Sequence, residues 1–242
     1  MRVVVVDDQD LFRAGFRLIL ETQPDITVVG EAADGVEAID LAVELAPDVV
    51  VMDVRMPRLD GVAATARICA QTRAKVLVMT MFDLDEYVYA ALRAGASGFL
   101  LKDLRRDELV DAVRIVAAGE ALLAPTVTRR LIADLARRGH PRPELARQLV
   151  ELTERERDIL RHLARGLSNA ELAAALVVTE HTVKTHVSSV LSKLGLRDRV
   201  QAVVFAYEAG LVVPGGSARE ATTHSTADPR ASACRPRPTP EE

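Results

Sequence analysis

Residues 1–21 read MRVVVVDDQDLFRAGFRLILE, and this stretch contains the unit from which the first half of the chain is built. Its apolar run, Val3–Val6, has the length of a buried strand and ends at Asp7 and Asp8. The next segment, Leu11–Glu21, carries apolar residues at three- and four-residue spacings, which is the period of an amphipathic helix. The stretch therefore predicts a strand, two carboxylates at its end, and a helix.

The same strand-then-helix unit recurs four more times up to about residue 120. Because strands and helices alternate, the predicted fold class is α/β, with a five-stranded doubly wound parallel sheet covered by helices on both faces. In such sheets the functional groups collect beyond the carboxyl ends of the strands. We expect the further strands at Ile26–Val29, Val49–Met52, Val76–Met79 and Gly98–Leu101, and the further helices near Gly35–Leu45, Gly61–Gln71, Glu86–Ala94 and Asp107–Ala118.

Polar side chains stand at the ends of these strands. Asp7 and Asp8 end the first strand, and Asp53, Thr80 and Lys102 end the third, fourth and fifth. Three carboxylates at one edge repel one another unless a divalent cation or the lysine supplies a counter-charge. Oxygen ligands of this kind suit Mg²⁺. Any one aspartate could instead cap the helix that follows it, but the five positions together favour a site.

The segments VVVVDDQ, VVMDVRMPRLDG, VMTMF and GASGFLLKD resemble the receiver domain of NarL/FixJ-type two-component response regulators, which has a flavodoxin-like fold. The resemblance covers residues 1–120 and implies that Asp53 is the phosphoacceptor. It also implies that Mg²⁺ is bound by Asp8, the Asp53 carboxylate and the backbone carbonyl of Arg55, with Asp7 contributing through water. A carboxylate nucleophile, a metal and an ammonium form a consistent set for phosphoryl chemistry.

Further positions of the receiver follow from the same resemblance. Thr80 and Lys102 would contact the phosphoryl oxygens. Thr80 would also form a switch with Phe99. The alternative is that Phe99 is simply a residue of the hydrophobic core. Met81 departs from the family, which often has a small residue there, and this puts the lifetime of the acyl phosphate in doubt.

The second half of the chain has a helical pattern with no strand-like runs. Capping boxes, in which a capping residue is followed three positions later by an acid or amide, mark helix starts. Four helices are therefore predicted as a small all-α domain. The signals are the pairs Thr153–Glu156, Ser168–Glu171 and Asp198–Gln201, a further cap at Thr179, and stops at Gly166, Gly195 and Gly210.

Two of these helices, Asn169–Leu176 and Glu180–Leu194, are separated by three residues, which is the spacing of a helix-turn-helix. The second helix of that motif lies in the major groove of DNA. Its apolar side should face the core through Val183, Val187, Val190, Leu191 and Leu194, and its polar side carries His181, Lys184, Thr185, Ser188 and Ser189. As a bare pattern, a polar helix face is usually only solvated.

Residues 151–213, with LTERERDILRHLARGLSNAELAAALVVTEHTVKTHVSSVLSKLGLRDRVQAV, resemble the LuxR-type helix-turn-helix. The resemblance implies DNA contacts by Thr182, Lys184 and Thr185, a base contact by Ser188 and a phosphate contact by Asn169.

The LuxR-type resemblance also assigns roles away from the recognition helix. It makes Arg155 and Glu156 structural, and Arg199–Ala209 a dimerisation helix with Val203 and Tyr207 at the interface. Packing of that apolar face within one subunit is the alternative.

Charge and composition divide the chain further. Lys and Arg minus Asp and Glu give −8 for residues 1–124 and +4 for residues 125–150, and zero for both remaining segments, 151–213 and 214–242. We expect a receiver at 1–120, a linker at 121–150 with a candidate helix at Thr126–Arg138, the DNA-binding domain at 151–213 and a disordered tail at 214–242. No long apolar run or signal peptide is evident, so a cytoplasmic protein without a membrane partner is expected.

The sequence thus predicts a DNA-binding response regulator, not an enzyme, in which phosphorylation of Asp53 by a sensor histidine kinase gates promoter binding. Expected partners are promoter DNA, the kinase, RNA polymerase and a second copy in the phosphorylated state. The acidic first half is expected to compete with DNA for the Lys184 face. One alternative is a haloacid dehalogenase-like phosphatase, but its second aspartate is replaced by Arg55. Another is an atypical regulator that acts without phosphate.

Overall fold

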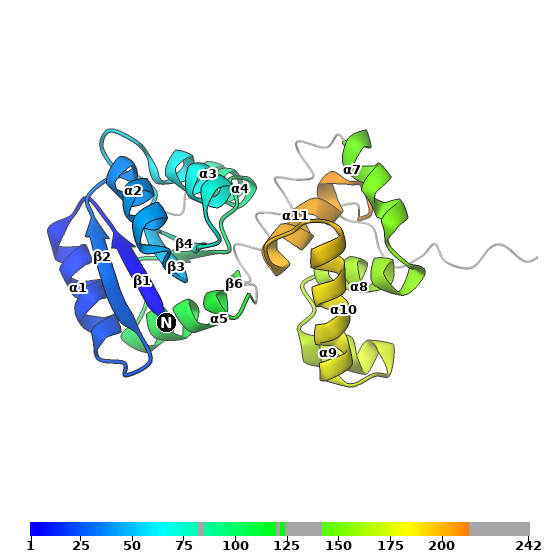
Figure 1. Ribbon diagram of the computed structural model, residues 1–242. Coiled ribbons are helices and arrows are strands. Elements are labelled where there is room, and N and C mark those ends of the chain that lie inside the picture. Colours follow the sequence, from blue (N-terminus) through cyan, green and yellow to red (C-terminus); the bar gives the residue numbers. More distant parts are fainter. Residues whose placement is uncertain (82–84, 120–121, 124–141, 213–242) are drawn as a thin grey trace, which may run out of the picture.

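The computed structural model describes residues 1–81, 85–119, 122–123 and 142–212. The chain forms an α/β domain and a helical domain that lie against one another (Figure 1). The candidate linker helix Thr126–Arg138 and the tail 214–242 lie outside these ranges. Within them, every helix is too short or too polar to cross a membrane.

The α/β domain is built on one parallel sheet, with strand order β2-β1-β3-β4-β5-β6. The predicted five-stranded parallel sheet is confirmed, and a two-residue strand, β6, extends it beside β5. This sixth strand is too short to leave a periodic signal in the sequence. The strands are β1 (Arg2–Val6), β2 (Thr27–Ala32), β3 (Val49–Asp53), β4 (Lys75–Thr80), β5 (Gly98–Leu101) and β6 (Leu122–Leu123).

Helices cover both faces of this sheet (Figure 1). Alternate residues of β1 and β3 divide between two buried clusters, which explains why these strands read as continuous valine runs. One face packs against α2 (Gly35–Leu45), α3 (Gly61–Gln71) and α4 (Asp85–Arg93), and the other against α1 (Asp10–Glu21) and α5 (Arg106–Ala117).

The helical domain contains the four predicted helices and a short one before them. Pro143 begins the extra helix, where its missing N–H costs nothing. Val177 ends α9 in the left-handed region, with φ of 54°. The helices are α7 (Pro143–Gln148), the 3₁₀ helix η1 (Leu149–Glu151), α8 (Glu154–Ala164), α9 (Asn169–Leu176), α10 (Glu180–Lys193) and α11 (Arg199–Glu208).

The predicted helix caps are found, with one correction. The boxes that begin α8 and α9 are complete, and Thr179 caps α10. Asp198 also caps α11 by accepting from the backbone N–H of Gln201. The Gln201 side chain does not return to close the box, because it donates instead to the carbonyl oxygens of Leu92 and Ala96 in the α/β domain.

Candidate functional site

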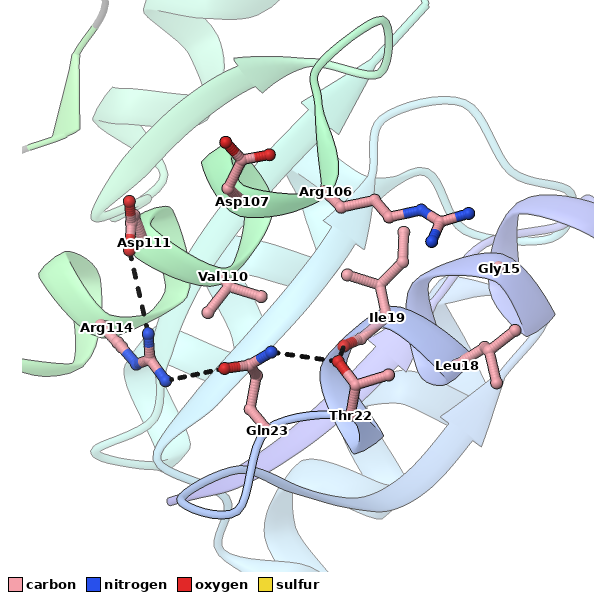
Figure 2. A pocket seen from close by; sticks show the side chains of 10 residues that line it. All are labelled: Gly15, Leu18, Ile19, Thr22, Gln23, Arg106, Asp107, Val110, Asp111 and Arg114. Atoms are coloured by element: carbon pink, nitrogen blue, oxygen red, sulfur yellow. Dashed lines mark hydrogen bonds and ion pairs between the residues drawn. The ribbon is translucent and has the colours of Figure 1, made fainter.

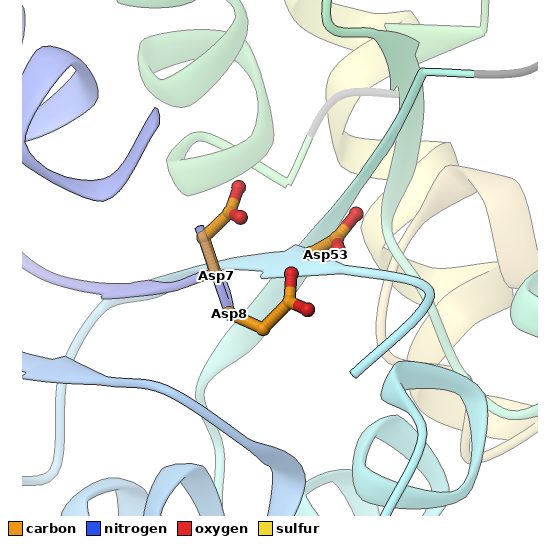
Figure 3. Close-up of side chains that lie close together, drawn as sticks. All are labelled: Asp7, Asp8 and Asp53. Atoms are coloured by element: carbon orange, nitrogen blue, oxygen red, sulfur yellow. The ribbon is translucent and has the colours of Figure 1, made fainter. Parts of the chain in front are cut away.

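Three carboxylates meet at the carboxyl end of the sheet (Figure 3). Asp7 follows β1, Asp8 comes next, and Asp53 is the last residue of β3. One oxygen atom from each lies within 4.8 Å of the others. Asp7 is 1% exposed and Asp53 is 6% exposed, whereas Asp8 faces solvent. The parallel pairing of β1 with β3 brings these residues together across 46 positions of sequence.

Lys102 supplies the counter-charge inside this cluster. Its ammonium lies 2.7 Å from Asp7 Oδ2 and 3.0 Å from Asp53 Oδ1. Burial raises the pKa of Asp53, and the nearby Lys102 charge offsets part of that rise. The arrangement holds a buried carboxylate next to a cation, in a pocket of about 210 Å³ whose wall also includes Thr80, Arg55 and Met81.

The carboxylates do not serve as caps for the helices that follow them. The N-cap residue of α1 is Gln9, whose side chain makes no capping hydrogen bond, and Asp60 caps α3. Asp7 Oδ1 accepts from the backbone N–H of Gln9, which leaves Oδ2 directed at Lys102. The alternative that strand-end aspartates only cap helices is therefore wrong for Asp7 and Asp53.

Gly61 fixes the backbone next to Asp53. Its N–H donates to the Val54 carbonyl oxygen at 2.8 Å, and a Cβ atom on Gly61 would lie 1.9 Å from the Asp53 carbonyl oxygen. Because no real Cβ contact is so short, only glycine permits this approach. The loop after β3 thereby closes tightly behind the carboxylate.

The second candidate surface is the polar side of α10. Val183 and Val190 are fully buried, while Lys184, Thr185 and Ser188 are exposed, as the helical period predicted. A hydroxyl-rich face with a lysine suits hydrogen bonds to a nucleic-acid backbone.

Other polar residues of this domain make contacts within the protein. Thr182 Oγ1 lies 2.9 Å from Thr179 Oγ1, and Asn169 Oδ1 accepts from Arg199. The expectation that Ser189 lies on the outer polar face is wrong. Its hydroxyl donates to the Glu156 carboxylate at 2.7 Å.

Glu156 connects two helices of this domain. Its carboxylate accepts from Ser189, from Lys193 at 2.7 Å and from the Thr153 backbone N–H at 2.8 Å. These contacts, with the Lys193 hydrogen bond as the largest cause, lower the pKa of Glu156 to about 2. Arg155 donates to the Leu176 carbonyl oxygen at the end of α9. Glu156 therefore joins α8 to α10, and Arg155 joins α8 to the end of α9.

Comparison with known proteins identifies both domains. The protein-family model for the response regulator receiver domain matches residues 3–114. The family model for the LuxR family of bacterial regulatory proteins matches residues 150–206. The chain belongs to the two-component response regulators with a LuxR-type DNA-binding domain. This is a family of transcription regulators and not of enzymes, and the phosphatase alternative is therefore wrong. Membership implies DNA and a kinase as partners.

Two relatives support this assignment over both domains, and one solved structure matches about half of the chain. The response regulator is 44% identical over 214 residues to the uncharacterized transcriptional regulatory protein YxjL of Bacillus subtilis, covering 88% of this chain and 97% of that one. It is 42% identical to the transcriptional regulatory protein LiaR of the same organism, covering 88% and 99%. A LuxR-family response regulator structure from Aurantimonas has 36% identity and a TM-score of 0.52, covering 55% of this chain and 96% of that one.

A set of polar contacts joins the receiver of this response regulator to α11. Ser97 donates to Asp198 Oδ2 at 2.6 Å, and Gln201 donates to Leu92 and Ala96. Glu208 accepts from Tyr89 at 3.2 Å and pairs with Arg93 at 3.0 Å. The receiver residues that make these contacts belong to α4 and to the segment between α4 and the start of β5, whereas Asp53 stands at the carboxyl end of β3.

The turn before α11 adds a charged part to this contact. Arg197 donates to the carbonyl oxygens of Cys69 and Ala74, both at 2.6 Å. Lys75 donates to the Arg197 carbonyl oxygen and lies 3.9 Å from Asp198. Burial lowers the pKa of Lys75, and the Asp198 charge acts in the opposite direction. The sequence signalled Asp198 only as a cap and gave no sign of the contacts of Arg197 and Lys75, because hydrophobic period and capping signals act only over short distances.

This contact bears on two expectations. The receiver is bonded to α11 and the turn before it, and Lys184 is exposed. Most of the basic linker lies outside the described residues, so competition between the acidic receiver and DNA for these cations stays a prediction. Val203 and Tyr207 are buried within the chain, and the Tyr207 hydroxyl donates to the Ala164 carbonyl oxygen. Packing within one subunit, which was the alternative for these two side chains, is therefore observed.

A larger pocket, of about 630 Å³, lies between α1 and α5 (Figure 2). Its polar side chains largely bond one another, since Arg114 donates to Gln23 and pairs with Asp111. None of the strand-end carboxylates lines it. The pocket is thus separate from the site around Asp53.

Proposed function

We propose that Asp53 is the phosphoacceptor of this response regulator and receives a phosphoryl group from a sensor histidine kinase in the cytoplasm. The observation that carries the proposal is the buried Asp53 carboxylate, 3.0 Å from the Lys102 ammonium, in a pocket that opens to solvent beside Asp8. The carboxylate is the nucleophile, and the lysine offsets negative charge that collects on the phosphoryl oxygens.

The cluster fits Mg²⁺. It offers only oxygen ligands, which suit this ion, and the three carboxylates lie close enough to share it. Asp7 Oδ2 is buried and, apart from its ion pair with Lys102, receives no well-directed hydrogen bond in the described part of the chain. Asp8, Asp53 and the Arg55 carbonyl oxygen would hold the ion directly, with Asp7 acting through water. When bound, Mg²⁺ neutralises negative charge on the phosphoryl oxygens.

Thr80 and Phe99 are proposed as the switch that reports phosphorylation. Thr80 is 4% exposed and lines the pocket, and Phe99 is 1% exposed on the neighbouring strand. The hydroxyl would move toward the phosphoryl oxygens and the ring would follow into the vacated space. Helix α4, which begins soon after Thr80, is the element that then carries the change to α11.

The DNA-binding surface is proposed to be the outer side of α10 with the start of α9. Lys184, Thr185 and Thr182 would contact DNA, Ser188 would contact a base edge and Asn169 a phosphate. Exposure supports this assignment for Lys184, Thr185 and Ser188, and the short hydroxyl side chains of Thr185 and Ser188 suit hydrogen bonds to DNA. Asn169 would have to exchange its present partner, Arg199.

Gating is proposed to act through α11. With Asp198, Gln201 and Glu208 bonded to the receiver, part of α11 is unavailable to a second copy of the chain. Phosphorylation would favour release of α11, homodimer formation, promoter binding and contact with RNA polymerase. Since a typical coupling is worth about 1–3 kcal/mol, the expected gating is about 5- to 150-fold.

The test is labelling of the full chain with acetyl phosphate and Mg²⁺, followed by intact mass and peptide mapping. Wild-type protein should gain one phosphoryl group on Asp53, and Asp53→Asn should gain none. Asp103→Asn, which changes an exposed aspartate beside Lys102, is the matched control and should label like wild type. Undiminished labelling of Asp53→Asn would show that the acceptor is another residue.

A further inference from the structure

The buried Lys102 ammonium has an aromatic neighbour besides its two carboxylates. Its Nζ atom lies 4.7 Å from the centroid of the Phe12 ring, which belongs to α1. The Lys102 side chain is only 1% exposed. A cation at this distance from a ring face is attracted by the negative charge of the π system, most strongly where water is excluded.

The attraction between the Phe12 ring and the Lys102 ammonium offsets part of the hydration energy that the ammonium loses on burial. A lysine ammonium has three N–H donors, and Asp7 and Asp53 are placed to accept from it. The aromatic face attracts the cation without competing as an acceptor for the N–H that a phosphoryl oxygen would need. A water molecule or a polar side chain in the same place would take that donor.

The position of the ring is fixed by its own helix. Phe12 packs on Phe16, with ring centroids 5.9 Å apart and a 36° angle between the planes, and Phe16 is 7% exposed. On the next residue, Arg13 Nη1 donates to the Asp7 carbonyl oxygen at 2.7 Å. The start of α1 is therefore tied to the strand end that carries the carboxylates, and the ring is held beside Lys102.

We propose that Phe12 is a positioning residue for phosphoryl transfer to Asp53, and that it acts by holding the Lys102 ammonium in line with the incoming phosphoryl oxygens. The inference rests on the proposed function. In that step an Asp53 oxygen forms a bond to phosphorus while the bond from phosphorus to the donor atom breaks, and the donor keeps the electron pair. Phe12 touches neither atom and works only through Lys102.

The first test compares Phe12→Leu with Phe12→Tyr in the full chain. Leucine preserves an apolar side chain and removes the π face, whereas tyrosine keeps both the ring and its negative face. With acetyl phosphate and Mg²⁺, Phe12→Leu should lower the labelling rate at saturating donor by roughly two- to thirtyfold, the range of cation–π energies. The donor concentration for half-maximal rate should change little, and Phe12→Tyr should restore the rate. Equal rates for Phe12→Leu and Phe12→Tyr would overturn the proposal.

A second test does not depend on phosphorylation. The chain has no tryptophan, so Phe12→Trp introduces a single indole beside Lys102. A cation over an indole ring shifts its emission, and adding Lys102→Met to Phe12→Trp should therefore change the emission maximum in metal-free protein. Leu11→Met, on an 83% exposed neighbour in α1, is the control second change and should leave the emission as it was. The same emission with and without Lys102 would refute the contact.

The two proposals fail in different ways. If wild-type protein is not labelled, or Asp53→Asn is labelled as well, the assignment of Asp53 is wrong. If wild-type protein is labelled on Asp53 and Phe12→Leu keeps its full rate, only the role of Phe12 is wrong.

Discussion

The Ser97 hydroxyl donates a 2.6 Å hydrogen bond to Asp198 Oδ2, across 101 positions of sequence. Ser97 is 1% exposed and Asp198 is fully buried. The other oxygen of Asp198 caps α11 by accepting from Gln201 N–H. One carboxylate therefore both begins α11 and attaches it to the receiver, so the start of this helix and the domain contact depend on each other.

Removing the Gln201 side chain should loosen the domain contact. Gln201→Ala loses hydrogen bonds to the Leu92 and Ala96 carbonyl oxygens but keeps the backbone N–H that Asp198 caps. At about 0.5–1.5 kcal/mol for each hydrogen bond, docking should weaken by about 1–3 kcal/mol. Unphosphorylated Gln201→Ala should bind its operator more tightly than unphosphorylated wild type, measured by fluorescence anisotropy at fixed salt.

The matched control for this change is Gln148→Ala, because Gln148 is exposed at the end of α7. It should leave operator affinity unchanged. If Gln201→Ala leaves both the affinity and the response to phosphorylation as in wild type, docking of α11 does not gate DNA binding.

Gly61→Ala should damage the site around Asp53. Its Cβ would lie 1.9 Å from the Asp53 carbonyl oxygen, so the strand end must move. We expect a loss of about 1–3 kcal/mol in unfolding free energy and slower labelling of Asp53. Gly15→Ala is the control, because nothing lies within 4 Å of its Cβ and it sits inside α1, where alanine should stabilise by up to about 1 kcal/mol. Normal labelling of Gly61→Ala would show that the loop adapts.

Glu156→Gln should destabilise the DNA-binding domain in a pH-dependent way. Since its contacts lower the pKa of Glu156 from 4.5 to about 2, the ionised carboxylate stabilises the folded domain above pH 4.5. This contribution is lost as the pH falls from 4.5 toward 2. At pH 7 the variant should lose about 1–3 kcal/mol in urea unfolding, and its difference from wild type should shrink below pH 4.5.

The control for this prediction is Glu171→Gln. Glu171 closes the same kind of capping box at Ser168, but it is exposed and does not reach α10. Its substitution should cost less than that of Glu156. Equal losses for the two variants, or a Glu156→Gln difference that is constant from pH 7 to pH 3.5, would contradict the role given to the contacts with α10.

Lys184→Ala should weaken DNA binding without affecting the fold. The side chain is exposed on α10, so its loss should remove about one contact to DNA and lower the slope of log affinity against log salt by about one unit. Circular dichroism and the melting temperature should match wild type. Unchanged affinity and slope would place the DNA-contacting face elsewhere on the domain.

Much of the fold could be predicted because its signals are local. A valine run such as Val3–Val6 and the cap at Thr153 are each readable within a few residues, and the structure has a strand and a helix there. The edge where Asp7, Asp53 and Lys102 meet could also be predicted, because parallel strands carry their ends to one side of a sheet. The role of Ser189 was misjudged because its partner, Glu156, lies 33 positions away.

The amino-acid sequence by itself determined the two domains' element order, the residues at the strand ends and the polar side of α10, since these follow from periodicity and capping between near neighbours. Only the tertiary structure decided that Gln201 bonds to the receiver, that Tyr207 is buried and hydrogen-bonded within its own subunit, and that Phe12 lies beside Lys102. Such contacts depend on how whole helices pack, and packing joins side chains whose distance along the chain carries no periodic trace.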